Sequence, residues 1–453
     1  MLRVIVRSKR DADAVKAVIR KFYQGWGLNV ETLKGARSID KAMEILEKYK
    51  HSSEFIIVIL GREDREIAST LESQTPLNFI IHTIPFAKVR NMRIEQLFHE
   101  LELAKSKIRL TVTWDSIRKV FILQRGGIPL EDLKFNPAFD VFFGLGEKTK
   151  AYLSTIIGGR IGLNPLLVRE FGGLHKVYCG PRKTGILRIP DEGIEPWGEK
   201  FTNEVYDVEL SKLIESNSHV LKLYESVSLK FLKRFRDWAD TVIIPWSGGK
   251  DSTAALLLAL KVFGSKKVTA IYANTGLEFP WTLEYVEKVT KLLNVKVYTV
   301  YVGLNEELRR GRSLPTHSNR WCTGLKINAI EKAVNELAQG NTLVVIGDRD
   351  AESERRGRRP LAKFIASDRL IVAPIKLWSA AHVQLYLTLN NIPLNPLYTI
   401  GFYRIGCYIC PALRSWEVYL MMRDSELVNS LISQPFYRDF INLRKSKNKE
   451  LTF

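Results

Sequence analysis

The sequence predicts a multidomain α/β protein whose C-terminal half is a doubly wound parallel sheet, and three observations carry this prediction. The chain has 453 residues, which is too long for one typical domain and corresponds to about three. Apolar runs of strand length alternate with helical patterns along most of the chain. One such run, at 241–246, leads through a turn with two glycines into a helical pattern at 253–260. Strands separated by helices pair in parallel, and ligands bind beyond their carboxyl ends.

Two segments of different character precede this sheet. Residues 1–105 alternate strand and helix signals, so we expect a small α/β domain of unknown role with a parallel or mixed sheet. Residues 106–205 are richer in Gly and Pro, which favours a mixed or β-rich module. The expected elements are strands at 4–6, 55–61 and 77–82, helices at 11–23, 39–49 and 65–71, and β-like pieces at 141–143 and 183–189.

The third segment, residues 206–453, begins with a helical stretch and then alternates strand and helix regularly. Such alternation is typical of a doubly wound sheet with helices on both faces. The expected elements are a helical stretch at 205–238, strands at 241–246, 268–272, 295–300 and 343–347, and helices at 253–260 and 283–293.

The turn after the strand at 241–246 has the chemistry of a phosphate site. The N–H groups at a helix N-terminus have no partners, and two glycines let an anion approach the backbone. Lys250 can neutralise a phosphate and Asp251 can hold a magnesium ion, although the spacing is not that of the Walker A motif. We therefore predict that a phosphate is bound by Ser247, Gly248, Gly249, Lys250, Asp251 and Ser252.

Two further polar segments follow predicted strands and are expected to face the same crevice. Arginine makes bidentate contacts to phosphate or sulfate, which a lysine would hold less directionally. Arg349 and Arg355 are the candidates for this role, with Arg356 as the alternative to Arg355, and Glu352 can orient Arg349 or a metal ion. The predicted nucleotide-binding residues of the two segments are Asn274, Gly276, Arg349, Glu352 and Arg355.

The composition indicates which partners and which cellular compartment to expect. The formal net charge is +19, and a chain this basic attracts polyanions, of which nucleic acid is the usual one. No apolar run reaches the length of about 18 residues that a membrane span needs. The N-terminus runs directly into a strand pattern, and four cysteines do not make a disulfide framework in a chain of this length. We expect a cytoplasmic protein without membrane attachment; the sequence does not indicate its oligomeric state.

The motif series resembles the phosphoadenosine phosphosulfate (PAPS) reductase-like family of the adenine nucleotide alpha-hydrolase superfamily, which also includes tRNA thiolases and ATP pyrophosphatases. The resemblance covers about residues 240–415, through the loop at 247–252 and the segments at 274–280 and 347–355. The chain departs from the family pattern at Asn274, where the reductases usually have aspartate. The resemblance implies that ATP or a sulfonucleotide binds in an adenine nucleotide alpha-hydrolase-like domain.

Three of the four cysteines are candidates for a metal or redox site. Cys407 and Cys410 stand in a Cys-x-x-Cys-Pro motif, and Cys322 precedes them. Three thiolates suit a [4Fe-4S] cluster with one open iron, as in cluster-dependent tRNA thiolases, whereas zinc would need a fourth ligand, for which His317 is a weak candidate. A dithiol or persulfide relay and inert thiols are the other interpretations. Cys179 stands alone and is expected to be a buried structural thiol.

The leading functional hypothesis is ATP-dependent adenylation followed by sulfur transfer, as in tRNA thiolation. Its catalytic residues would be Lys250, Asp251, Cys322, Cys407 and Cys410, and its partners tRNA or another nucleic acid and a sulfur donor. The alternative is a sulfonucleotide reductase that releases sulfite with an electron donor. The reductases use a cysteine in a C-terminal tail, and no cysteine follows Cys410 here. A third hypothesis is a nucleic-acid-binding protein that is regulated by nucleotide without turnover.

Overall fold

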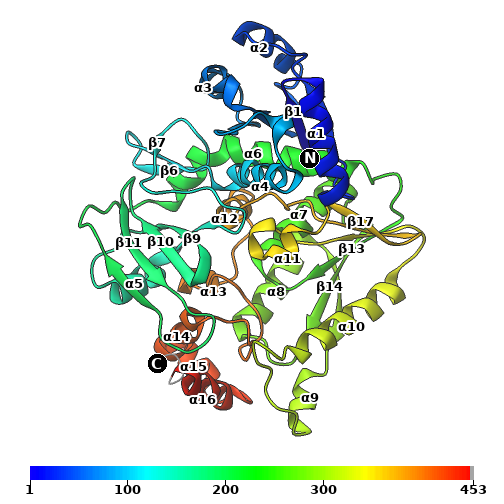
Figure 1. The fold of residues 1–453 in the computed structure, drawn as a ribbon. Coiled ribbons are helices and arrows are strands. Elements are labelled where there is room, and N and C mark those ends of the chain that lie inside the picture. The colour runs from blue at the N-terminus through cyan, green and yellow to red at the C-terminus, as the bar shows by residue number, and fades with distance from the viewer. Residues whose placement is uncertain (449–453) are drawn as a thin grey trace.

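The computed structural model describes residues 1–448 and confirms the predicted fold class, an α/β chain with a parallel sheet in its C-terminal half (Figure 1). Within these residues the strands form four sheets. The last residues of the predicted third segment, 449–453, lie outside the described part. None of the described helices is both long and apolar enough to span a membrane.

The N-terminal sheet is fully parallel, with the strand order β2-β1-β3-β4. Its elements are β1 (Leu2–Val6), α1 (Lys9–Phe22), β2 (Asn29–Thr32), α2 (Ile39–Glu47), β3 (Phe55–Leu60), α3 (Arg65–Gln74), β4 (Phe79–Thr83) and α4 (Ile94–Leu110). Strand β3 is buried at every position, which explains its unbroken apolar run. Sequence analysis missed β2, which is polar and not buried at any position, and α4, whose buried face includes Lys105 and Arg109.

The middle of the chain folds into two antiparallel sheets. A small one has the order β6-β5-β7, and a larger one has the order β12-β11-β10-β9-β8. Cys179, the residue after β10, is fully buried, and its Sγ accepts a hydrogen bond from the N–H of Gly162 at 3.2 Å. This confirms the prediction that Cys179 is a buried structural thiol. The elements are β5 (Thr113–Asp115), β6 (Val120–Ile122), β7 (Ile128–Pro129), β8 (Asp140–Phe143), α5 (Gly146–Ile157), β9 (Leu166–Arg169), β10 (Leu174–Tyr178), β11 (Lys183–Arg188) and β12 (Trp197–Lys200).

The C-terminal sheet has the order β15-β14-β13-β16-β18-β17, and all neighbours except β17 and β18 are parallel. Its strands are β13 (Thr241–Trp246), β14 (Val268–Asn274), β15 (Lys296–Tyr301), β16 (Thr342–Val345), β17 (Ala362–Ala366) and β18 (Arg369–Val372). The β17–β18 hairpin was not predicted, because β17 is an edge strand that is largely exposed.

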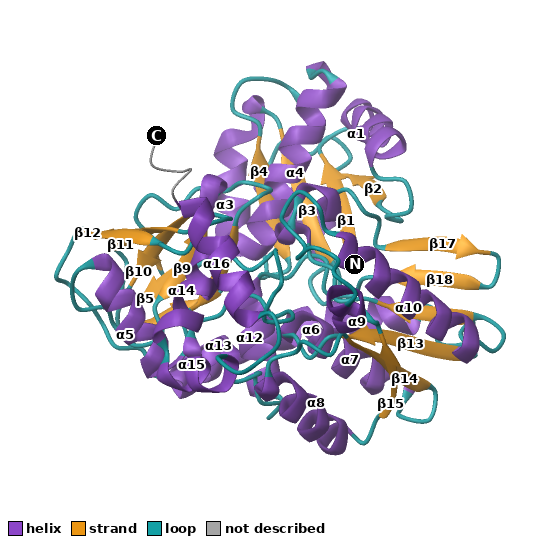
Figure 2. Cartoon of the chain, turned by 90° about the horizontal axis from the view of Figure 1, so that it is seen from below, coloured by secondary structure: helices purple, strands orange, loops and turns teal. Residues whose placement is uncertain are grey.

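Helices cover this sheet and continue beyond it. They are α6 (Leu210–Lys233), α7 (Lys250–Phe263), α8 (Pro280–Leu293), α9 (Leu304–Arg309), α10 (Trp321–Leu337), α11 (Glu354–Gly357), α12 (Ala380–Leu389), α13 (Leu397–Ile400), α14 (Ser415–Arg423), α15 (Ser425–Leu431) and α16 (Tyr437–Asn448). In Figure 2 the strands β13 to β15 and the hairpin β17–β18 lie on one side of the molecule, with the strands β9 to β12 on the other.

The sheets share one hydrophobic core. Val4 of β1, Tyr224 of α6, Val242 of β13 and Leu385 of α12 belong to a single cluster of buried side chains. Helices α6 and α12 lie near the centre of Figure 1, where they pack against each other and both against α7. The N-terminal elements are therefore packed onto the C-terminal sheet through a continuous apolar interior.

His382 is buried at the centre of this core. Its ring stacks on Tyr224 of α6 with the centroids 4.0 Å apart, and its Nδ1 lies 2.6 Å from the Ser379 hydroxyl, which caps α12. Burial lowers the pKa of His382 to about 3. The imidazole is therefore neutral in the folded chain at every pH above that value.

This burial predicts a pH-dependent loss of stability. An unfolded histidine has a pKa of about 6.5, so between pH 7 and pH 5 the unfolded chain binds a proton at His382 that the folded chain does not. The free energy of unfolding falls by about 2 kcal/mol over this interval because of His382 alone. Urea unfolding of His382→Gln at the two pH values should show a decrease about 2 kcal/mol smaller than that of the wild type.

His51→Gln is the control for this measurement. His51 is exposed, and the substitution should leave the pH dependence of unfolding unchanged. Parallel curves for His382→Gln and the wild type would contradict the prediction.

Candidate functional site

The strand order of the C-terminal sheet reverses between β13 and β16, and the candidate site lies in this crevice. β13 has β14 on one side and β16 on the other, and all three are parallel. Residues 247–252 follow β13, and residues 347–352 follow β16 after Ile346. A cavity of about 480 Å³ opens at this point. Its position agrees with the general rule that ligands of open α/β sheets bind at a topological switch point.

The cavity brings together most of the predicted nucleotide-binding residues. Its lining includes Ser247, Gly249, Lys250, Asp251, Ser252, Arg349 and Glu352. The lining does not include Gly248, Asn274, Gly276 and Arg355. Arg355 is exposed, whereas Arg356, the alternative from sequence, lines the cavity together with Arg359. The side chain of Asn274 closes its own turn by accepting a hydrogen bond from the N–H of Gly276 at 2.7 Å.

The loop at 247–252 has the shape of an anion cradle. Helix α7 begins at Lys250 with Gly249 as its N-cap, which has no side chain to cap the helix. The N–H of Lys250 donates a hydrogen bond to the Tyr398 hydroxyl at 3.0 Å. Gly248 has a φ of +70°, a left-handed conformation that a residue with a side chain adopts only under strain. A Cβ on Gly347 would lie 2.7 Å from the backbone of Asp251, so only glycine lets the two loops pack together. These features leave the N-terminus of a long helix facing the cavity.

The charged groups of the loop are paired with a buried arginine. The Oδ1 of Asp251 accepts a hydrogen bond from the Nε of Arg349 at 2.6 Å, and its Oδ2 lies 3.0 Å from the Nζ of Lys250. Burial favours a higher pKa for Asp251, but the Arg349 and Lys250 charges outweigh it and lower the pKa to about 2. Asp251 is thus an anion held by two cations, one at each carboxylate oxygen.

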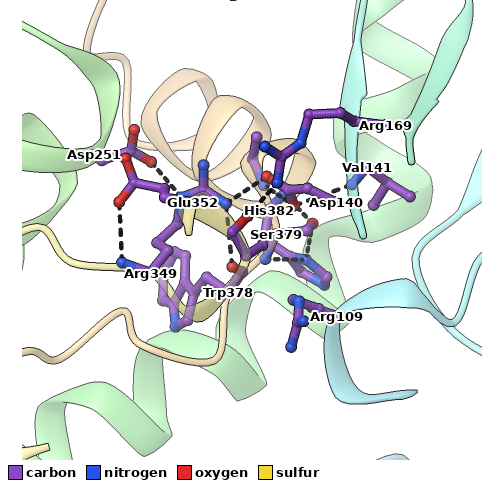
Figure 3. A network of polar contacts seen from close by, with 12 residues as sticks. Arg109, Asp140, Val141, Arg169, Asp251, Arg349, Glu352, Trp378, Ser379 and His382 are labelled. Carbon is purple, nitrogen blue, oxygen red and sulfur yellow. Dashed lines mark hydrogen bonds and ion pairs between the residues drawn. The ribbon is translucent and has the colours of Figure 1, made fainter. Parts of the chain in front are cut away.

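The second partner of Arg349 comes from the middle of the chain. Asp140, the first residue of β8, is fully buried, and its Oδ2 lies 2.7 Å from the Nη1 of Arg349 (Figure 3). It also accepts hydrogen bonds from the Tyr403 hydroxyl at 2.9 Å and the N–H of Ala380 at 3.1 Å. Burial opposes ionisation, but Arg349 and the other nearby arginines lower the pKa of Asp140. Sequence reasoning missed Asp140, although an acidic residue that opens a buried apolar strand is itself unusual.

A smaller cavity of about 120 Å³ adjoins the first one. The two cavities share Ser247, Ile330 and Ile405 in their walls. The smaller one is lined by residues 271–273 of β14 and by Gly406, and its wall is mainly apolar. A polar cavity connected to an apolar one suits a ligand with a charged part and a flat apolar part.

The three cysteines that the sequence singles out, Cys322, Cys407 and Cys410, lie near the smaller cavity. Cys407 is buried and belongs to a hydrophobic cluster, against which the half-buried Cys410 and Cys322 both pack. A hydrogen bond from the Cys407 thiol lowers the pKa of Cys410 to about 5, and the same bond raises the pKa of Cys407. The contact between the two thiols thus favours ionisation of Cys410 over that of Cys407.

The three thiols do not form a metal-ligand set as they stand. Among the described residues, no group of three or more His, Cys, Asp or Glu side chains is placed to hold a metal ion. The geometry thus supports a dithiol at Cys407 and Cys410 more directly than an iron–sulfur ligand set with Cys322.

Comparison with known proteins identifies the C-terminal sheet. Residues 241–413 match the family model of the phosphoadenosine phosphosulfate reductase domain, so this part of the chain is a PAPS reductase domain of the adenine nucleotide alpha-hydrolase superfamily. Adenine nucleotide binding is typical of the fold of this domain.

The individual relatives are partial and distant. An uncharacterised protein of Methanocaldococcus jannaschii is 32% identical over 47% of this chain and 45% of its own length. An adenosine 5′-phosphosulfate reductase of Chelativorans is 26% identical over 40% of this chain and 71% of its own length. A crystal structure of the PAPS reductase from Candida auris matches with a TM-score of 0.34 and 21% identity, over 43% of this chain and 96% of that one. The chain thus spans about half of the length of the first relative.

The buried Arg349–Asp140 pair makes a prediction about stability. In Asp140→Asn the guanidinium keeps Asp251 but loses its other counter-charge, and breaking a buried pair leaves a charge without compensation. The free energy of unfolding should fall by about 3 kcal/mol in urea titrations. Asp237→Asn, at an exposed aspartate, should change it by no more than about 0.5 kcal/mol. Equal values for the two variants would contradict the prediction.

Proposed function

We propose that the protein activates an acceptor with ATP and then transfers sulfur to it, with tRNA or another nucleic acid as the acceptor. The observation that carries this proposal is the continuity between the phosphate loop and the dithiol. Ile405 lines both cavities, and the next residue, Gly406, lines the smaller one. A Cβ on Gly406 would lie 3.3 Å from the Sγ of Cys410, so the thiol stands directly behind the cavity wall.

The two cavities suit the two parts of ATP. The triphosphate is expected at residues 247–252, where the amides of α7 and Lys250 face the larger cavity. The adenine ring is expected in the smaller cavity, against β14 and Ile330. This placement directs the α-phosphate toward the residues that both cavities share.

Activation is expected to proceed by displacement at phosphorus. An oxygen of the acceptor attacks the α-phosphorus, the bond to the bridging oxygen breaks, and pyrophosphate leaves. Lys250 and the α7 amides stabilise the negative charge that accumulates on the phosphates. Arg349 holds Asp251, and thereby the loop, in a fixed position for this step. The magnesium ion that accompanies ATP would have to be held by the phosphates, or by Asp251 after release of one of its partners.

Sulfur transfer is expected to use the dithiol. A persulfide donor loads a sulfur atom on Cys410, and this terminal sulfur attacks the activated carbon and displaces AMP. Cys407 then attacks the Cys410 sulfur, which releases the thiolated product and leaves a Cys407–Cys410 disulfide. An external thiol must reduce this disulfide before the next turnover. A cluster held by Cys322, Cys407 and Cys410 would require rearrangement of these side chains, so no step is assigned to it.

A second candidate function is reduction of a sulfonucleotide with release of sulfite. The match of residues 241–413 to the PAPS reductase domain and the adenosine 5′-phosphosulfate reductase of Chelativorans favour it. In this reaction the Cys410 thiolate would attack the sulfonate sulfur and displace the nucleotide by breaking the S–O bond to its phosphate. Cys407 would then attack the Cys410 sulfur, which releases sulfite and leaves the disulfide.

The first step predicts that pyrophosphate release depends on the acceptor. Pyrophosphate should appear from ATP when bulk tRNA is present and should be nearly absent without it. Lys250→Ala removes a charge from the phosphate site and should lower the rate by about 100-fold. Lys266→Ala is the matched control, because Lys266 is exposed beyond the other end of α7, and it should retain the wild-type rate. Sulfite release from adenylylsulfate without pyrophosphate release from ATP would replace this proposal with the second candidate.

The sulfur-transfer step predicts that a variant can lose thiolation of the acceptor and still release pyrophosphate from ATP. Cys410→Ser should retain pyrophosphate release, because Cys410 lies behind the wall and not at the phosphate loop, but should lose thiolation of the acceptor. Cys179→Ser is the control and should retain both half-reactions, because Cys179 is buried in another part of the chain. Full thiolation by Cys410→Ser, measured by mass spectrometry of the digested acceptor, would overturn the sulfur-transfer step.

A further inference from the structure

Arg169 is a buried arginine that has no acidic partner within ion-pair distance among the described residues. It ends strand β9, is 8% exposed, and lines the larger cavity. Its Nη2 donates hydrogen bonds to the carbonyl oxygens of Ala138, at 3.2 Å, and of Ala351. Its Nε is buried and has no hydrogen-bond partner in the structure. The charge of Arg169 contributes to lowering the pKa of the buried Asp140, but no carboxylate among the described residues lies at ion-pair distance from it. Its buried Nε is therefore a donor that an anion in the cavity can use.

Two further arginines line the same cavity. Arg404 is exposed and makes no ion pair within the described part of the chain, and it follows Tyr403, whose ring lies 5.8 Å from the guanidinium of Arg169. Arg414 pairs through its Nε with Asp191 at 3.1 Å, and the Asp191 side chain is 61% exposed. Arg169 and Arg414 both lie outside the matched domain, residues 241–413.

The other cations of the cavity already have carboxylate partners. Lys250 and Arg349 share Asp251, and Arg356 and Arg359 both pair with Asp348. Of the remaining arginines that line the cavity, Arg169 and Arg404 have no ion-pair partner among the described residues, and Arg414 pairs with the largely exposed Asp191. Arg404 directly precedes Ile405 and Gly406, which lead to the dithiol.

We propose that Arg169, Arg404 and Arg414 form a second anion site, which binds a phosphate group of the acceptor while the nucleotide occupies the loop at 247–252. A phosphate is favoured over a carboxylate because it carries up to two charges and several acceptor oxygens, which matches more than one guanidinium fork. This inference rests on the proposed function and deepens it, because it names the group by which the acceptor is held beside both ATP and Cys410.

The test is phosphate binding by the full chain with its nucleotide site filled. Equilibrium dialysis with radiolabelled inorganic phosphate is carried out at saturating α,β-methylene ATP, and the affinity for the analogue is measured in parallel. The wild type should bind phosphate beside the analogue. Arg169→Gln should weaken phosphate binding by about tenfold, which corresponds to the loss of one charge-assisted hydrogen bond, and should leave the analogue affinity within about twofold.

Two other variants make the result decisive. Arg404→Gln alters an exposed side chain, so it tests the site without the folding risk of a buried position, and it should also weaken phosphate binding. Arg188→Gln, at an exposed arginine of β11 outside the cavity, should change neither affinity. Competition then identifies the source of the phosphate: displacement by a short single-stranded RNA indicates a nucleic acid backbone, and displacement by glycerol phosphate indicates a small phosphomonoester.

The failure of this inference differs from the failure of the proposed function. No phosphate binding beside the bound analogue, or unchanged phosphate affinity in both Arg169→Gln and Arg404→Gln, would overturn the second anion site alone. Phosphate binding that depends on Arg169 in a chain that does not bind the analogue would support the anion site and remove the proposed use of ATP.

Discussion

The contact on which the candidate site depends is the buried ion pair between Arg349 and Asp140. Taking a guanidinium and a carboxylate out of water costs several kcal/mol for each ion, so both are tolerated only when they are paired and hydrogen-bonded. Arg349 satisfies this condition with one carboxylate from the middle of the chain and one from the phosphate loop. The position of Asp251 is thereby tied to a strand that is not part of the C-terminal sheet.

A second buried cation makes the same connection from the N-terminal side. Lys105 of α4 is fully buried, and its Nζ lies 3.0 Å from Asp350 and 2.6 Å from Glu102. Asp350 also pairs with Lys376 at 3.3 Å. Because Asp350 follows Arg349 directly, the turn after β16 receives a charged contact from each of the two preceding parts of the chain. The segments before the sheet thus help to fix the turn after β16, and Arg169 of β9 is itself part of the cavity wall.

The local features of the sheet could be predicted from sequence, because each depends on a short stretch of residues. The apolar run at 241–246 and the two glycines after it indicate a strand and a helix start without reference to the rest of the fold. Lys250, Asp251 and Arg349 were found for the same reason, as polar residues at strand ends. Strand β17 contains no continuous apolar run of strand length, so the sequence pattern does not indicate it.

The parts that could not be predicted depend on contacts between distant segments. Asp140 and Arg169 lie near the cavity only because the antiparallel sheet packs beside the switch point. The periodicity of the sequence does not indicate which face of that sheet packs against the C-terminal sheet. Arg355 and its alternative Arg356 are adjacent in the sequence, so the pattern does not distinguish them. Only the direction of α11 separates the exposed Arg355 from Arg356, which lines the cavity. The relation of Cys322 to the Cys-x-x-Cys pair is likewise set by α10, far from it in the chain.

The separation of Asp140 and Arg349 along the chain, 209 residues, also determines when the site can form. Contacts between such distant residues are late events in folding, since a long loop must close before they contribute. During synthesis the N-terminal strands emerge before β16 and the turn that carries Arg349. Asp140 therefore lacks its partner Arg349 until β16 joins the sheet. The ability to bind a ligand in the cavity is consequently acquired at the end of folding, so ligand binding reports that the whole chain has been assembled.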